Sequence, residues 1–287
     1  MEIAIISGKG GTGKSSISAA FATLSERVVL ADCDVDAANM HILFQPVVDE
    51  EVAFIGNQKA VIDPERCTNC GLCLDYCRFD AIAQINHKVV IDDVACDGCH
   101  LCYRICPFGA IDMENSDKSR LYTGSFRNGR MVSGRLAPGE ENSGKLVNLV
   151  REKARQQSRE YQHPIIILDG PPGIGCPVIS TITGSDHVVI VTEPSLSGYS
   201  DLKRTLDITT KFQLHTWVII NKYDLNPEMS ETILSFCHQT GITVAGMLPF
   251  DPIVVEAMVN CRSITEWDSG SSLASDIHKA FRQIING

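Results

Sequence analysis

A glycine-rich stretch near the N-terminus, SGKGGTGKSS at residues 7–16, limits the possible folds of this chain more than any other segment. It follows the β-branched run EIAII and precedes the helix-like run ISAAFATL. From Gly8 to Ser15 the spacing is Gly-x-x-x-x-Gly-Lys-Ser, the pattern of a phosphate-binding loop between a strand and a helix. We therefore expect an α/β domain that binds a nucleotide; the alternative is a chance glycine-rich turn.

Each residue type in such a loop has its own role. Glycines let backbone N–H groups approach phosphate oxygens, and the positive end of the helix dipole attracts the same oxygens. Lys14 would reach the β- and γ-phosphates, and the Ser15 hydroxyl would ligate Mg²⁺. The expected nucleotide-contacting residues of the loop are Gly8, Lys9, Gly10, Gly11, Thr12, Gly13, Lys14, Ser15 and Ser16.

Apolar runs alternate with helical patterns along most of the remaining chain. The predicted strands are RVVLAD, PIIILD, HVVIVT, HTWVIIN and ITVAGMLP, and SLASDIHKAFRQII predicts a final helix. Asn226 before Pro227 indicates a helix start, Ser143 is a candidate N-cap, and RLYTGSFRNGRMVSGRL predicts a hairpin. This alternation predicts a doubly wound, mostly parallel sheet that binds nucleotide at the carboxyl ends of its strands.

The cysteines form a duplicated pattern between the first strand–helix unit and PIIILD. Residues 67–77, CTNCGLCLDYC, and residues 96–106, CDGCHLCYRIC, share the spacing C-x2-C-x2-C-x3-C at an interval of 29 residues. The flanks RFDAI and PFGAI repeat as well. Such spacing favours iron–sulfur clusters, and zinc is the alternative.

This duplication resembles the bacterial two-cluster ferredoxins, in which the fourth cysteine of each run serves the other cluster. The resemblance implies that Cys67, Cys70, Cys73 and Cys106 hold one 4Fe–4S cluster, and that Cys77, Cys96, Cys99 and Cys102 hold the second. Arg78 stands where the pattern normally has proline, whereas Pro107 follows the second run. We expect an inserted α+β ferredoxin-like domain at residues 59–115, within an ATPase domain formed by residues 1–58 and 116–287.

Lys9 lies inside the phosphate loop, and the string KGGTGKS resembles the deviant Walker A motif of the MinD, ParA and nitrogenase iron-protein superfamily. In that family this lysine crosses to the phosphates of the partner subunit. The resemblance implies a homodimer that sandwiches ATP at its interface. The alternative for Lys9 is a solvated loop lysine.

The same resemblance assigns roles to three aspartates. Asp32 would help to hold the water shell of Mg²⁺, and Asp169 would bind Mg²⁺ through water. Asp34 would orient or deprotonate the attacking water, with Asp36 as the alternative. The expected catalytic residues are Lys9, Lys14, Asp34 and Asp169.

Three residues are expected at the base of the nucleotide. The resemblance to the superfamily implies that Asn221 contacts the edge of the nucleobase, and Pro249 with Phe250 would close the pocket. The string Asn-Lys-Tyr-Asp that begins at Asn221 also resembles the guanine-binding NKxD motif, so GTP is the alternative to ATP.

Four of the twelve cysteines lie outside the duplication. Core packing is expected for Cys33 and Cys237, whereas the context of Cys261 is uninformative. Cys176 follows Asp169 by seven residues, as a cluster-bridging cysteine does in the nitrogenase iron protein, but Asn142 stands where that protein has its second cysteine. Cys176 would then face its copy across the dimer and hold a metal or a labile cluster; the alternative is packing under the switch.

Charge and hydropathy restrict the partners and the location. The net charge of −10 argues against nucleic acid bound through its phosphates and favours partners with basic surfaces. No apolar run reaches the ~18 residues of a membrane span, and the N-terminus lacks the basic region of a signal peptide. A cytoplasmic protein is expected.

Three functions follow from these motifs. The first is a slow ATPase whose nucleotide-gated homodimer passes electrons from two 4Fe–4S clusters to a redox protein or metalloprotein, for example a second related ATPase. The second is an ATP-dependent carrier of iron–sulfur clusters or metal. The third is a non-catalytic interaction module controlled by nucleotide.

Overall fold

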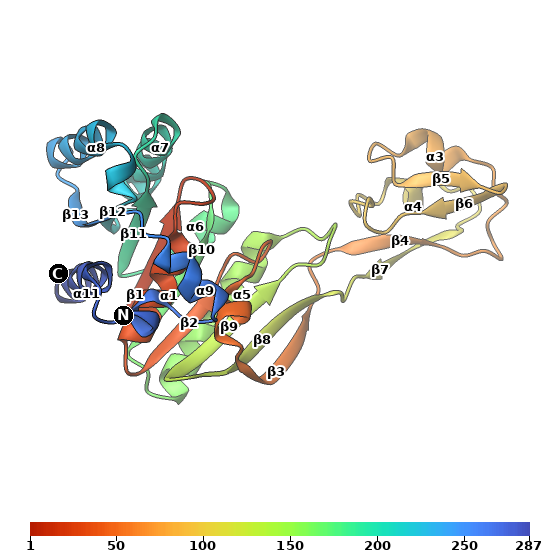
Figure 1. The fold of residues 1–287 in the computed structure, drawn as a ribbon. Helices are drawn as coiled ribbons and strands as arrows, with labels where there is room; N and C mark the ends of the chain where they lie inside the picture. The colour runs from red at the N-terminus through yellow and green to blue at the C-terminus, as the bar shows by residue number, and fades with distance from the viewer.

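The computed structural model describes all residues from 1 to 287 and contains a nine-stranded sheet with helices on both faces (Figure 1). The strand order is β13 (Thr243–Leu248), β12 (His215–Asn221), β11 (His187–Thr192), β1 (Glu2–Ser7), β10 (Ile165–Pro172), β2 (Val28–Asp32), β9 (Gly129–Arg135), β8 (Ser119–Phe126) and β3 (Val47–Phe54). The strands from β13 to β9 pair in parallel, and β8 and β3 are antiparallel additions at one edge. The predicted mostly parallel sheet is confirmed.

The predicted hairpin around the Asn-Gly turn is β8–β9. Strand β3 was not predicted, because VVDEEVAF does not alternate and all its residues except Phe54 are exposed. Its acidic side chains instead form ion pairs with basic residues of neighbouring elements, namely Asp49 with Arg130, Glu50 with Lys153 and Glu51 with Arg120. Long-range charge pairing therefore helps to hold this edge strand.

Alternate residues of the strands face two helical layers. The helices of the sheet domain are α1 (Lys14–Leu24), α2 (Met40–Phe44), α5 (Ser143–Glu160), α6 (Cys176–Ile182), α7 (Leu196–Lys211), α8 (Pro227–Gln239), α9 (Ile253–Val259), α10 (Ile264–Trp267) and α11 (Ser272–Asn286), with a 3-10 turn at Tyr223–Leu225. Ile3 and Ile5 pack in the layer of α1 and α11, whereas Ala4 and Ile6 pack in the layer of α5 to α8. Cys33 and Cys237 are fully buried in this second layer, as expected. None of the helices combines the length and apolar character that crossing a bilayer requires.

The helix starts agree with the sequence at one site and differ at another. Asn226 caps α8, because its side chain accepts a hydrogen bond from the N–H of Met229. Ser143 is the first residue of α5 and not its N-cap; the cap position belongs to Asn142, which is left-handed (φ 69°). The Asn142 side chain donates to the Gly56 carbonyl, so a tertiary contact fixes this end.

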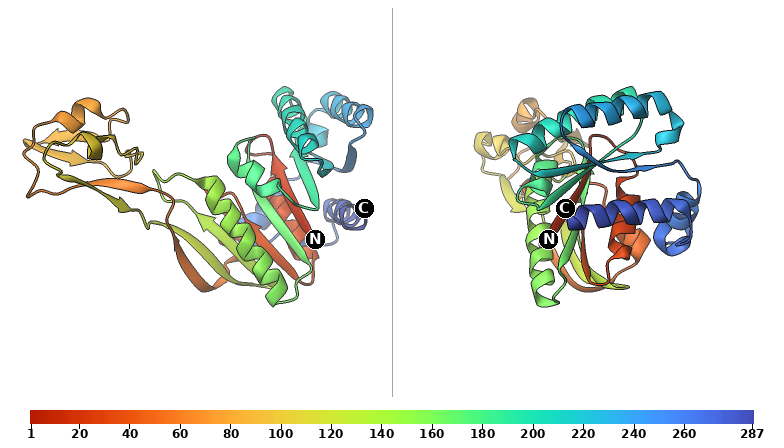
Figure 2. Two further views of the ribbon diagram at one scale, coloured as in Figure 1. Left: turned by 180° about the vertical axis from the view of Figure 1, so that it is seen from behind. Right: turned by 90° about the vertical axis from the view of Figure 1, so that its left-hand side faces the viewer.

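A two-stranded arm continues from β3 and β8 and carries the cysteine-rich segment away from the sheet (Figure 2). It consists of β4 (Gln58–Ile62) and β7 (Ile111–Asn115), which pair antiparallel. The Ser116 N–H donates to the Asn57 carbonyl at 3.1 Å, which links the two ladders.

The cysteine-rich unit beyond the arm contains α3 (Leu72–Tyr76), β5 (Ile82–Ile85), β6 (Lys88–Ile91) and α4 (Leu101–Ile105). Its two halves make equivalent hydrogen bonds at the 29-residue interval. The Asp63 N–H donates to the Ala110 carbonyl at 2.8 Å, and the Asp92 N–H donates to the Ala81 carbonyl at 2.8 Å. The sequence duplication is therefore also a structural duplication.

Candidate nucleotide site and cysteine-lined cavities

The phosphate loop connects β1 to α1 and depends on glycine for close approaches. Gly13 has φ 90°, and a Cβ there would lie 2.2 Å from the Asn221 amide nitrogen. A Cβ on Gly8 would lie 2.4 Å from the Cβ of Asp201. The loop can therefore sit against β12 and α7 only with glycine at these positions.

A polar cavity of about 330 Å³ opens above this loop. Its lining consists of Ser7, Gly10, Gly11, Thr12, Gly13, Lys14, Ser15, Ser16, Asp34, Asn39 and Pro172. The Thr12 hydroxyl is buried without a hydrogen-bond partner, and an unpaired buried polar atom is costly. A phosphate oxygen would supply the missing partner, so these residues fit a nucleotide polyphosphate.

Asp169 lies within β10, three residues before the strand ends at Pro172, and is fully buried. It accepts hydrogen bonds from Lys14 at 3.1 Å and Ser15 at 2.8 Å. Ser18, one turn into α1, also donates to it at 2.7 Å. Ser18 was not predicted, although a polar residue four positions after Lys14 on an apolar helix was the available signal. The predicted lysine, serine and aspartate therefore lie together.

Asp32 is fully buried beside this group, and it accepts hydrogen bonds from the backbone N–H groups of Asp34, Asn39 and Met40. Burial, reinforced by the charge of Asp169, raises the pKa of Asp32 to about 7. Asp34 is half-buried and lines the phosphate cavity, whereas Asp36 is exposed and does not. Burial also raises the pKa of Asp34.

A second cavity, of about 230 Å³, lies next to the loop on the side of α9 and α11. Asn221, Pro249 and Phe250 line it, together with apolar side chains such as Met258. The Asn221 amide donates to the Thr12 carbonyl at 2.7 Å, so it also braces the loop. Asp224 does not line this cavity, and its carboxylate accepts from the Phe250 N–H at 2.6 Å. The guanine-selecting aspartate of an NKxD motif would instead have to face the base.

Lys9 is neither free in solvent nor directed away from its own chain. Its ammonium lies 2.7 Å from a Glu193 carboxylate oxygen and donates to the hydroxyls of Ser195 at 3.2 Å and Ser197 at 2.8 Å. Lys9 is thus a partly exposed loop lysine that is paired within its own chain. Burial would raise the pKa of Glu193, but the hydrogen bond and charge of Lys9, with help from Lys222, hold it below its usual value. Glu193 was not predicted, and its signal was a charged residue directly after β11.

The segment from Gly173 to Gly175 joins β10 to α6 and borders the phosphate loop. The Gly173 N–H donates to the Ser7 carbonyl at 2.8 Å. Cys176, the first residue of α6, is exposed. A Cβ on Gly144 would lie 3.5 Å from the Cys176 Cβ, so the starts of α5 and α6 adjoin. Cys176 is thus accessible and not packed under the switch.

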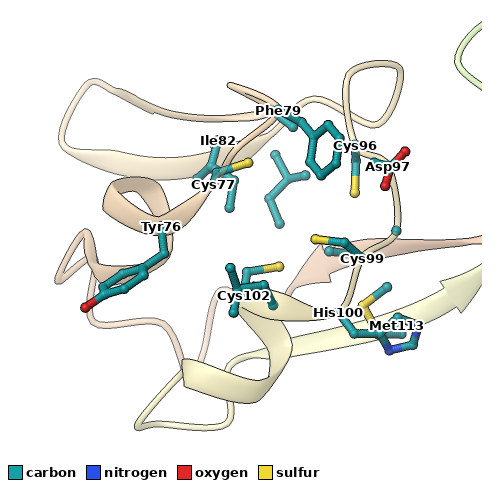
Figure 3. A pocket seen from close by; sticks show the side chains of 15 residues that line it. Tyr76, Cys77, Phe79, Ile82, Cys96, Asp97, Cys99, His100, Cys102 and Met113 are labelled. Atoms are coloured by element: carbon teal, nitrogen blue, oxygen red, sulfur yellow. The ribbon is translucent and has the colours of Figure 1, made fainter.

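The eight cysteines of the duplication line two cavities. The Cys96 cavity is lined by Cys77, Cys96, Cys99 and Cys102 with mainly apolar neighbours, and Figure 3 shows the four sulfur atoms facing a common space. The Cys67 cavity is lined by Cys67, Cys70, Cys73 and Cys106. Arg78 is exposed. No group of three or more His, Cys, Asp or Glu side chains lies as a single metal ion would require.

Known proteins match most of this chain by sequence and by fold. Residues 3–264 match the model of the CobQ/CobB/MinD/ParA nucleotide-binding domain. The uncharacterized protein MJ0578 of Methanocaldococcus jannaschii is 38% identical over 229 residues, which cover 79% of each chain. The cell-division ATPase MinD of Pyrococcus furiosus has a similar fold, with a TM-score of 0.58 and 16% identity over 99% of this chain and 98% of that one.

Two further solved structures share the fold. MinD of Pyrococcus horikoshii, in complex with Mg-ADP, gives a TM-score of 0.59 at 17% identity and covers 99% of this chain and 95% of its own. A ParA-family ATPase of Chlorobium tepidum gives 0.58 at 15% identity, with 98% of both chains covered. The chain belongs to the CobQ/CobB/MinD/ParA family of nucleotide-binding domains.

Proposed function

We propose that this chain is a P-loop ATPase that carries two 4Fe–4S clusters and passes their electrons to a partner protein under the control of ATP. The observation that carries the proposal is the distribution of the eight duplicated cysteines. Each cavity takes three cysteines from one run and the fourth from the other run, which is the crossed pattern of two-cluster ferredoxins. A cubane needs thiolates spread around a volume, whereas a single zinc ion needs them at one point.

The cysteine-rich unit, residues 59–115, would then be a ferredoxin-like insertion in an ATPase domain formed by residues 1–58 and 116–287. Bound clusters would supply one-electron chemistry at low potential. The unit's own residues hold the thiolates in place and surround them with apolar side chains. The Ala110 N–H also donates to the Cys106 sulfur at 3.3 Å, the kind of contact that tunes a cluster.

At the nucleotide site, Lys14 and Ser15 would move from Asp169 to the phosphates and to Mg²⁺. MinD of Pyrococcus horikoshii binds Mg-ADP on the same fold, which supports adenine nucleotide and magnesium here. Asp169 and Asp32 would then hold the water shell of the ion. Asp34 lines the phosphate cavity and would orient the attacking water.

Lys9 supports a nucleotide-gated homodimer. Within its own chain it is bound to Glu193, which directly follows β11. Release from Glu193 would free Lys9 to reach phosphate across an interface between two copies. ATP would therefore bind more tightly to the arrangement in which Lys9 reaches phosphate than to the one in which Lys9 is bound to Glu193. Gating requires such a difference in affinity. We expect a cytoplasmic protein whose partner is a redox protein or metalloprotein.

The exposure of Cys176 favours a second candidate, the ATP-dependent delivery of a cluster or metal. Anaerobic incubation of the dithionite-reduced protein, freed of excess dithionite, with Mg-ATP, a chelator and an oxidised acceptor dye separates the two. Electron transfer predicts that iron stays bound while a reduced acceptor dye appears, and that Cys176→Ala changes neither. Loss of iron to the chelator on ATP addition, abolished by Cys176→Ala, would favour delivery. Undetectable hydrolysis in the presence of an acceptor would favour an interaction module.

A further inference from the structure

The two halves of the cysteine-rich unit differ at one pair of equivalent lysines. The 29-residue interval relates Lys59 to Lys88, which is exposed on β6. Lys59 is only 7% exposed, and its ammonium lies 2.6 Å from the Cys96 carbonyl oxygen. It also donates to the Gly139 carbonyl at 2.6 Å. A buried cation therefore joins the Cys96 cavity to the segment before α5.

That segment, Ala137–Asn142, is here named the junction loop. Gly139 has φ 74°, and a Cβ there would lie 2.2 Å from the Val94 carbonyl oxygen, so only glycine allows this contact. Glu140 accepts a hydrogen bond from Ser116 at 2.5 Å, at the base of the arm. The junction loop thus holds the half of the unit that contains Cys96, and not the half that contains Cys67.

The other end of the junction loop leads to the nucleotide switch. Gly144 in α5 adjoins Cys176, which follows the Gly173–Gly175 segment. Further along α5, Arg151 donates to the Ser180 carbonyl at 2.6 Å and the Thr183 carbonyl at 2.7 Å. Helices α5 and α6 are therefore bound to each other, and a shift of α6 would reach the junction loop.

We propose that Lys59 is a positioning residue that couples the group held in the Cys96 cavity to the nucleotide switch. This inference rests on the proposed iron–sulfur function. A buried ammonium beside a cluster stabilises the extra negative charge of its reduced form and so raises its reduction potential. Because the junction loop holds the ammonium, nucleotide that moves α6 would change that potential. By linkage, reduction would change nucleotide affinity to the same extent.

Two carboxylates belong to the same junction. Asp97 lines the Cys96 cavity, and Glu141 of the junction loop lies beside it. These acids oppose the effect of Lys59. Removing the lysine would leave these negative charges uncompensated, so its removal should lower the reduction potential of the cluster.

The test is an anaerobic redox titration of the intact protein followed by electron paramagnetic resonance. Lys59→Met should make the reduction of one cluster tenfold less favourable, which lowers its midpoint potential by about 59 mV for one electron. Lys59→Arg should restore this midpoint potential. The matched Lys88→Met should leave both clusters unchanged. Mg-bound non-hydrolysable ATP should shift the same signal in the wild type and not in Lys59→Met.

Equal shifts in Lys59→Met and Lys88→Met, or a nucleotide response that survives in Lys59→Met, would overturn the inference. If the Lys59→Met protein loses its iron, the Gly139→Ala protein is measured in its place. Gly139→Ala displaces the carbonyl that accepts from Lys59 and keeps the charge of the lysine. Gly139→Ala should abolish the nucleotide response, and an intact response would again overturn the inference. A wild type without iron would instead refute the proposed function, so the two failures are distinct.

Discussion

The Lys14 ammonium lies 3.1 Å from a carboxylate oxygen of Asp169, and both side chains are buried. The phosphate-loop lysine is thus paired within its own chain. Nucleotide binding has to exchange this pair for contacts with phosphate and Mg²⁺.

The burial of this pair makes Lys14 important for stability. Breaking a buried pair costs about 3–5 kcal/mol because one charge stays uncompensated. Lys14→Met should therefore lower the free energy of unfolding of the nucleotide-free protein by that amount. The partly exposed pair of Lys9 and Glu193 is worth only about 0–1 kcal/mol, so Lys9→Met is the control. Urea unfolding followed by Trp217 and Trp267 fluorescence measures both, and equal losses would contradict the account.

The raised pKa of Asp32 predicts proton release. Because its folded pKa, about 7, lies above the usual aspartate pKa of 3.8, its protonation stabilises the fold at low pH. That contribution is lost as pH rises from 3.8 through about 7. Mg²⁺ favours the carboxylate, so binding of Mg-nucleotide near pH 6 should expel a proton, and the release should vanish above about pH 8.

Calorimetry in buffers of different ionisation enthalpy measures this release. Asp32→Asn should reduce it by one proton per chain at pH 6, whereas the exposed Asp36→Asn should not. Identical release from the wild type and Asp32→Asn would show that another group titrates.

The contact between Lys9 and Glu193 predicts a gain of dimerisation. Glu193→Gln weakens the hold on Lys9 and should tighten the ATP-dependent dimer by up to about fivefold, the equivalent of an exposed ion pair. Sedimentation velocity with ATP, in an Asp34→Asn background to prevent hydrolysis, measures the change. Glu228→Gln, at an exposed site on α8, is the control. A weaker dimer, or full dimerisation by Lys9→Ala, would argue against the role of Lys9.

Thiol accessibility tests the position of Cys176. A maleimide reagent should modify it rapidly in the nucleotide-free protein, because it is exposed, while Cys33 and Cys237 stay unmodified in the core. Mg-ATP should slow modification if the dimer covers the start of α6. Peptide mass spectrometry follows each cysteine separately, and unchanged rates with ATP would place Cys176 outside the interface.

Local patterns predicted the parts of the molecule that depend on local chemistry. The β-branched runs predicted the parallel strands, and the Gly-Lys-Ser spacing predicted the loop that holds Lys14. The turn at Asn-Gly predicted the β8–β9 hairpin. These features depend on residues close together in sequence.

Features that depend on distant partners were not predictable in the same way. Strand β3 has no amphipathic pattern, and its ion pairs come from elements far along the chain. The helix cap at Asn142 depends on Gly56, and the position of Lys9 depends on Glu193. Lys59 and Lys88 have similar sequence contexts, and the contacts of Lys59 with the distant Cys96 and Gly139 carbonyls are not visible in either context.

The iron and acid-labile sulfide content of the protein purified without oxygen is the most direct test of the central claim. Two 4Fe–4S clusters predict about eight iron and eight sulfide per chain. Cys99→Ala and Cys70→Ala should each remove about four of the eight irons, because they belong to different cavities. Stoichiometric zinc without sulfide, or no metal at all, would contradict the account.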